Sequence, residues 1–60
     1  RRGVYLKKQI RKGDIIKKED LIFLRPNIGT HSKDFELVIN SKALKNIEPL
    51  DPIFLNIDYK

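Results

Sequence analysis

Hydrophobic residues occur along the chain in short groups that turn-forming residues separate. The groups at Val4–Lys7 and Ile22–Arg25 are predicted strands, and Pro26 ends the second because its nitrogen has no hydrogen to donate to a ladder. Lys42–Ile47 and Ile53–Leu55 are predicted as two further short strands. Short apolar runs between breakers are typical of strands, so the sequence predicts a chain that is mainly β.

Two segments favour short helical turns. Lys17–Leu21 is predicted to form one turn. Residues 31–39 are the best helix candidate, because three apolar side chains at positions i, i+3 and i+4 share one face: Phe35, Val38 and Ile39. Ser32 is the predicted N-cap, and Asn40 suits a left-handed position after the helix. The chain is expected to fray from about Asp58.

The chain contains a faint internal repeat. Lys8–Ile16 aligns with Lys45–Ile53, and four of the nine positions are identical: Lys8/Lys45, Ile10/Ile47, Asp14/Asp51 and Ile16/Ile53. Each copy is predicted to fold as strand, turn and strand, with a tight turn at Lys12–Asp14 in the first copy. A single hairpin cannot bury an apolar face alone, so two of them are expected to share one core with approximate two-fold symmetry.

The composition limits what the chain can hold. Its 60 residues are enough for one domain with a thin core. It has no cysteine and one histidine, which excludes disulfides, thiolate metal sites and multi-histidine metal sites. The absence of cysteine fits a cytoplasmic location, and no signal peptide or membrane-spanning run is visible. The chain begins without methionine, so we expect it to be part of a longer protein.

Charge is distributed unevenly along the chain, which has a net charge of +5. Residues 1–18 carry eight basic residues against one acidic residue, whereas residues 19–60 carry five basic and seven acidic residues. A basic segment fits nucleic acid, an anionic lipid, an anionic partner surface or a solvated face with no partner. No aromatic residues alternate with these lysines as a stacking platform requires, so no nucleic-acid partner is expected.

Independent catalysis is not expected from these residues. His31 has no cysteine or serine nucleophile in a known motif, and the adjacent Ser32 is better explained as a helix cap. The neighbouring acids Glu19 and Asp20 more plausibly support a helical turn than form a general acid–base pair. The three glycines lie far apart, so no phosphate-binding glycine loop exists.

Arg25 is the candidate functional residue. It follows an apolar strand, and Pro26 restricts its backbone to extended angles. Its guanidinium offers five N–H donors and no acceptor, which suits a carbonyl, carboxylate or phosphate oxygen of a ligand. The alternative is a structural arginine that pairs with Asp34, Glu36 or a backbone carbonyl. The residues alone leave both interpretations open.

Two stretches carry a resemblance to a known family. Ile10–Ile16, followed by Glu19-Asp20-Leu21, resembles the SAF (antifreeze-like) pattern. Leu24–Gly29, followed by a short helix and a second turn, is similar to the C-terminal domain of bacterial N-acetylneuraminate synthases, including the legionaminic and pseudaminic acid synthases. The start Arg1-Arg2 also fits this domain, and the likeness covers residues 1–57.

The resemblance implies a fold and a function. The fold would be a small β-clip of short strands, turns and one or two helical turns. The parent enzyme would join a (β/α)8 barrel to this C-terminal cap and condense phosphoenolpyruvate with an N-acyl hexosamine, using a divalent metal held by the barrel. In a domain-swapped homodimer, Arg25 would contact the acylamino group of the sugar in trans. The supporting loop residues would be Pro26, Asn27 and Gly29, the last of which is free to take a positive φ.

Two departures from the family pattern concern turns. Pro49-Leu50 stands where the second turn usually has Lys-Gly, and Asn40 replaces a glycine.

Other SAF proteins suggest two alternative functions, a periplasmic flagellar or pilus assembly module and an ice-binding surface. Ice binding calls for a flat uncharged surface, whereas the corresponding segment Lys17–Asp20 is four charges in a row.

Overall fold

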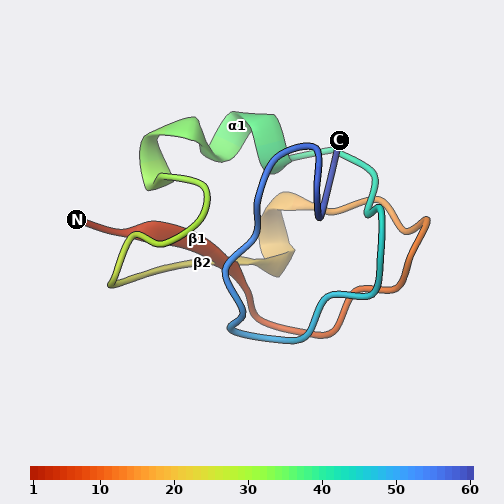
Figure 1. Ribbon diagram of the computed structural model, residues 1–60, viewed down its shortest axis with the longest axis horizontal. Helices are drawn as coiled ribbons and strands as arrows, with labels where there is room; N and C mark the ends of the chain where they lie inside the picture. Colours follow the sequence, from red (N-terminus) through yellow and green to blue (C-terminus); the bar gives the residue numbers. More distant parts are fainter.

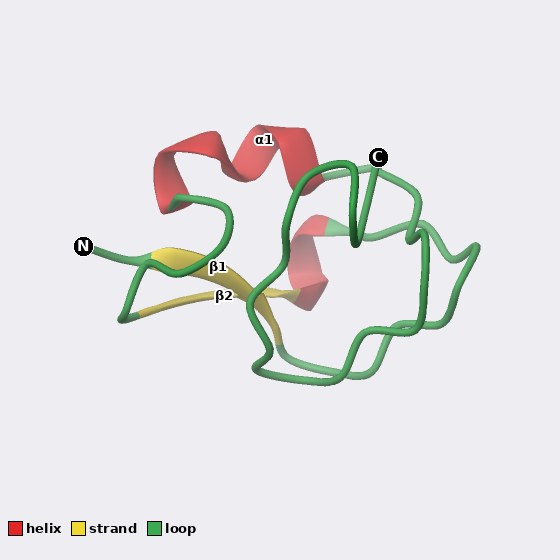
Figure 2. Ribbon diagram, viewed as in Figure 1, coloured by secondary structure: helices red, strands yellow, loops and turns green.

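Two short antiparallel strands and a series of turns make up the fold. The computed structural model describes residues 1–60, and its elements in chain order are β1 (Gly3–Leu6), η1 (Lys18–Asp20), β2 (Leu21–Leu24), η2 (Ser32–Asp34) and α1 (Phe35–Val38). β1 pairs with β2 from Gly3↔Leu24 to Leu6↔Leu21. The rest of the chain is turns and isolated β-bridges, as Figure 2 shows. This arrangement of short strands and turns is the predicted β-clip.

Both regular strands lie one residue earlier than predicted. β1 begins at Gly3 and ends at Leu6, and β2 ends at Leu24, so that Arg25 follows the strand. The register places Leu6 opposite Leu21, and both side chains are buried. Burial of this pair favours the observed bounds, because the hydrophobic effect is the dominant favourable term in folding.

The two copies of the internal repeat pair with each other. Ile10 and Ile47 occupy equivalent positions, and each donates a backbone hydrogen bond to the other at 3.0 and 2.8 Å. Gly13 donates to the carbonyl oxygen of Ala43 at 2.9 Å. Figure 1 shows the two segments side by side at one end of the molecule. The prediction of two self-paired hairpins is therefore wrong, whereas the predicted two-fold relation is confirmed by the reciprocal isoleucine pair.

Equivalent turns follow the two isoleucines. In Arg11–Asp14 and in Glu48–Asp51, the last residue donates its backbone N–H to the first carbonyl, at 3.0 and 3.3 Å. Gly13 has a φ of 92°, and Leu50 has a φ of 67° at the equivalent position. Asn40, which also departs from the family pattern, has a φ of 65° as predicted. The chain therefore keeps left-handed backbone at Leu50 and at Asn40, although neither residue is glycine.

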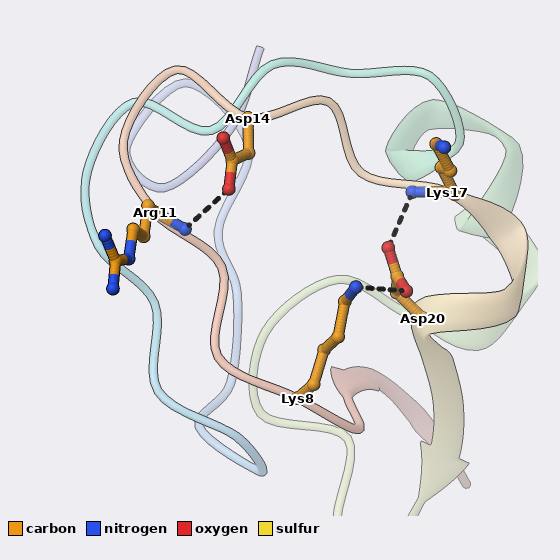
Figure 3. A network of polar contacts seen from close by, with 5 residues as sticks. All are labelled: Lys8, Arg11, Asp14, Lys17 and Asp20. Carbon is orange, nitrogen blue, oxygen red and sulfur yellow. Dashed lines mark hydrogen bonds and ion pairs between the residues drawn. The ribbon is translucent and has the colours of Figure 1, made fainter.

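A buried aspartate follows each copy of the repeat. Asp20 and Asp58 each pair with an equivalent lysine, Lys8 at 3.5 Å and Lys45 at 3.1 Å. Asp20 Oδ2 accepts the backbone N–H of the residue three positions earlier at 3.2 Å. Asp58 Oδ2 accepts the backbone N–H of the residue four positions earlier at 2.8 Å. Figure 3 shows the first of these networks, which supplies hydrogen-bond and ion-pair partners to a carboxylate that is only 8% exposed.

The predicted helix over residues 31–39 is a 3-10 turn, η2, continued by the single turn of α1. Ser32 is not its N-cap. Instead His31 caps η2, because its Nδ1 accepts the backbone N–H of Lys33 at 3.0 Å. Val38 is fully buried, and Phe35 and Ile39 pack against the core as their spacing predicted. No helix is both long enough and apolar enough to cross a membrane.

The core is one cluster that draws residues from both copies of the repeat. Its members are Val4, Leu6, Ile10, Ile16, Leu21, Val38, Ala43, Ile47, Ile53 and Tyr59. The prediction that the chain frays from Asp58 is wrong, because Tyr59 is fully buried. Lys60 and Lys42 also exchange two backbone hydrogen bonds of 3.0 Å. Lys42–Ile47 and Ile53–Leu55 pair only through isolated bridges and do not form the two regular strands predicted there.

Candidate functional site

Arg25 lies at the start of the loop that joins β2 to η2. Its side chain is exposed and takes part in neither of the two ion pairs of the protein. No hydrogen bond joins it to Asp34 or Glu36, so the structure does not show the alternative of a structural arginine. Figure 1 shows that the loop turns at the end of the molecule where the N-terminus lies, opposite the paired repeat segments. Arg25 thus presents free donors at one end of the domain.

β1 fixes the first half of this loop. The hydroxyl group of Tyr5 donates a hydrogen bond to the carbonyl oxygen of Pro26, and Tyr5 is buried. The peptide bond between Arg25 and Pro26 is cis. A Cβ atom added to Gly3 would lie 3.2 Å from Asn27 Cα, so the backbones of β1 and the loop are in close contact. The buried side chain of Tyr5 therefore holds Pro26, the residue that directly follows Arg25.

The C-terminal half of the chain fixes the other end of the loop. A Cβ atom added to Gly29 would lie 2.3 Å from the carbonyl oxygen of Ile53. Thr30 donates its backbone N–H to the same oxygen at 2.8 Å, and its hydroxyl lies 2.6 Å from the hydroxyl of Tyr59. Among the glycines only Gly13 has a positive φ, so backbone conformation does not explain a glycine at position 29. Glycine is needed there because a side chain would not fit in this close approach. The freedom of Gly29 to take a positive φ is therefore not used in this fold.

The loop supplies donors and an apolar surface but no reactive group. Asn27 and Ile28 are exposed beside the arginine. The Nδ1 atom of His31 is already occupied as a helix cap. No three His, Cys, Asp or Glu side chains come together to hold a metal ion. The arrangement can position a ligand oxygen through charge-assisted hydrogen bonds, which are stronger than neutral ones.

Three surface hollows exist, and Arg25 lines none of them. Two are related by the internal repeat, with volumes of about 360 and 450 Å³, and equivalent residues such as Lys8 and Lys45 line them. The third, of about 310 Å³, lies between Gly29 and Leu37. A ligand held by Arg25 would therefore obtain most of its enclosure from another surface.

The sequence profile of the SAF domain matches residues 1–56. The chain belongs to the SAF domain family. Two relatives from Campylobacter jejuni subsp. jejuni are both named pseudaminic acid synthase. One, from serotype O:23/36 (strain 81-176), is 38% identical over 47 residues, and the other, from serotype O:2 (strain ATCC 700819 / NCTC 11168), is 34% identical over 47 residues. Each match covers 78% of this SAF domain and 14% of the relative.

The comparisons confirm the predicted resemblance. This SAF domain is related to a sialic acid synthase-type enzyme, and it spans about one seventh of the length of the relatives it matches. The sequence interpretation singled out Arg25 and its loop but missed Tyr5 and Thr30, which anchor that loop. The bond from Tyr5 spans 21 residues, so no local pattern could have indicated it.

Proposed function

We propose that this SAF domain is the substrate cap of a sialic acid synthase-type enzyme, in which Arg25 donates hydrogen bonds to the acylamino group of an N-acyl hexosamine. The observation that carries the proposal is a guanidinium without a partner on a loop anchored at both ends. An anchored donor spends little conformational entropy on binding, so it orients a ligand effectively. The supporting residues are Pro26, Asn27 and Gly29.

The longer cytoplasmic protein would contain a (β/α)8 barrel that condenses phosphoenolpyruvate with the sugar. Arg25 lines no hollow of its own domain, which supports a site completed by a second surface. In the proposed homodimer, the cap of one subunit covers the barrel of the other. A divalent metal does not fit this domain, which has no cluster of metal-ligating side chains, so its ligands would come from the barrel.

The kinetics of Arg25→Ala in the longer enzyme test this proposal. We expect kcat/KM for the N-acyl hexosamine to fall about tenfold or more, with little change for phosphoenolpyruvate, because a hydrogen bond from a charged donor contributes about 1.5–3 kcal/mol. Arg11→Ala is the matched control, since Arg11 is also exposed and belongs to the first copy of the repeat, a segment that Figure 1 shows at the opposite end of the domain. Unchanged kinetics for both substrates in Arg25→Ala would refute the proposed role.

Mixed dimers test whether Arg25 acts in trans. One subunit carries Arg25→Ala with an intact barrel, and the other carries Arg25 with an inactivated barrel. If the cap serves the other subunit, the mixture regains up to one working site per mixed dimer. If the cap serves its own barrel, no site in the mixed dimer combines Arg25 with an intact barrel, and the mixture is no more active than its components.

A further inference from the structure

We infer that Phe23 selects the length of the acyl group that the sugar carries, by providing an apolar contact beside Arg25. This inference rests on the proposed function and adds a specificity-determining residue to the same site. It combines three observations on Phe23: its position on β2, its exposure and its contact with a second aromatic ring.

Phe23 and Arg25 are expected on the same side of the chain. Side chains alternate between the two faces of a strand, so residues two positions apart share a face and lie about 7 Å apart. Phe23 pairs with Val4 in the ladder, and Arg25 follows β2 directly. The donor and the ring are thus expected to be neighbours where the chain leaves β2.

The ring of Phe23 is only partly used by the fold. It is 40% exposed, whereas its partner Val4 is 1% exposed and Leu21, on the same face, is 8% exposed. Leu21 and Val4 are buried although the outer part of the Phe23 ring is exposed. The core beneath β2 therefore does not need that part of the ring to exclude water. The exposed part of Phe23 is therefore available to a ligand.

A second ring holds Phe23 in place. The centroids of Phe23 and Phe35 are 5.9 Å apart, and their planes meet at 77°, which is a favourable edge-to-face arrangement. Phe35 in turn packs against the hydrophobic core. An exposed ring that is fixed by its neighbour offers an apolar surface of defined position, unlike a mobile surface side chain.

The chemistry of an acylamino group matches this pair. Its carbonyl oxygen accepts a hydrogen bond, and its alkyl end is apolar and lies within a few ångströms of that oxygen. Arg25 suits the oxygen, and the exposed ring suits the alkyl end. Burial of one additional CH₂ group changes a binding preference about fourfold, so contact with Phe23 would distinguish acyl chains that differ by one carbon.

The test measures kcat/KM of the longer enzyme for hexosamines that carry N-formyl, N-acetyl and N-propanoyl groups. We expect Phe23→Ala to change the ratio between neighbouring acyl chains by at least threefold, with the KM for phosphoenolpyruvate unchanged. A ratio between substrates is independent of the amount of folded enzyme. Phe23→Leu, which retains more apolar volume, replaces Phe23→Ala if the latter does not fold.

Ile15→Ala is the matched control, because Ile15 is an apolar residue exposed to 49% that lies in the first copy of the repeat, where it pairs with Lys42 and not with the loop of Arg25. Its ratios are expected to equal those of the unmodified enzyme. Ratios within twofold of the unmodified enzyme in the Phe23 variant would overturn the inference. If Arg25→Ala still impairs use of the sugar, this result leaves the proposed function standing. If Arg25→Ala has no effect, the proposed function itself fails.

Discussion

The hydroxyl group of Tyr5 in β1 donates a hydrogen bond to the carbonyl oxygen of Pro26, and this bond joins β1 to the loop that carries Arg25. Tyr5 is 5% exposed, so its ring is enclosed by the rest of the protein. The position of the candidate ligand donor is therefore set by a residue that does not contact the ligand.

Tyr5→Phe removes only this hydroxyl group. We expect the free energy of unfolding to fall by about 0.5–1.5 kcal/mol, the usual net contribution of one hydrogen bond. In the longer enzyme, KM for the sugar should rise while KM for phosphoenolpyruvate stays the same, because the loop becomes less well positioned. Urea denaturation and steady-state kinetics measure the two effects. An equal rise in both KM values would argue against a positioning role.

Replacement of Leu50 by glycine should stabilise the protein. Leu50 has a φ of 67° and is 57% exposed, so little packing is lost. Left-handed backbone costs an L-residue about 1–2 kcal/mol, and the added chain entropy of glycine offsets part of that gain. We expect a net increase of about 0.5–1 kcal/mol in the free energy of unfolding, measured by urea denaturation.

Gly13→Ala is the complementary variant at the equivalent position. Gly13 has a φ of 92°, and an added Cβ would meet no atom within 4 Å, so any loss of stability reports the backbone alone. We expect a loss of about 1 kcal/mol. A loss of stability in Leu50→Gly as large as that in Gly13→Ala would contradict the equivalence of the two turns.

Gly29→Ala tests the close approach between the loop and the C-terminal half. The added Cβ would lie 2.3 Å from a backbone oxygen of Ile53, which cannot move as a flexible side chain can. We expect a loss of about 1–3 kcal/mol in stability, typical of overpacking, together with weaker use of the sugar. Thermal denaturation and kinetics measure these changes. A variant with unchanged stability would show that the loop is not packed against Ile53 as described.

The two buried aspartates should differ in their contribution to stability. Asp58 makes the shorter contacts, 3.1 Å to Lys45 Nζ and 2.8 Å to a backbone nitrogen, against 3.5 and 3.2 Å for Asp20. We expect Asp58→Asn to lower the free energy of unfolding by about 1–3 kcal/mol and Asp20→Asn by less. Lys45→Ala should cost under about 1 kcal/mol, because the lysine side chain is 60% exposed. An order of stabilities in which Asp20→Asn is the less stable variant would contradict this ranking.

Elements that have a signal in the local sequence were predicted well. The turn at Gly13, the left-handed Asn40 and the apolar face of the helical segment are all found in the structure. The pairing of the repeat could not be predicted in this way. A hairpin and a two-fold pair satisfy the same local pattern, and only the reciprocal bond between Ile10 and Ile47 distinguishes them.

The candidate site shows the same division between local and long-range information. The strand end, Pro26 and the donor chemistry of Arg25 are local features, and they made Arg25 a candidate while leaving a structural role open. The anchors come from distant parts of the chain, since Gly29 is fixed by Ile53 and the loop by Tyr5. The edge-to-face contact of Phe23 likewise depends on the fold.

The central claim is that Arg25 binds the acylamino group, and a comparison of two substrates tests it most directly. The longer enzyme and its Arg25→Ala variant are assayed with an N-acyl hexosamine and with the corresponding free-amine sugar, which lacks the acyl carbonyl. We predict that Arg25→Ala lowers kcat/KM about tenfold or more for the acylated sugar and less than about twofold for the free amine. An equal loss for both sugars, or no loss for either, would contradict the account.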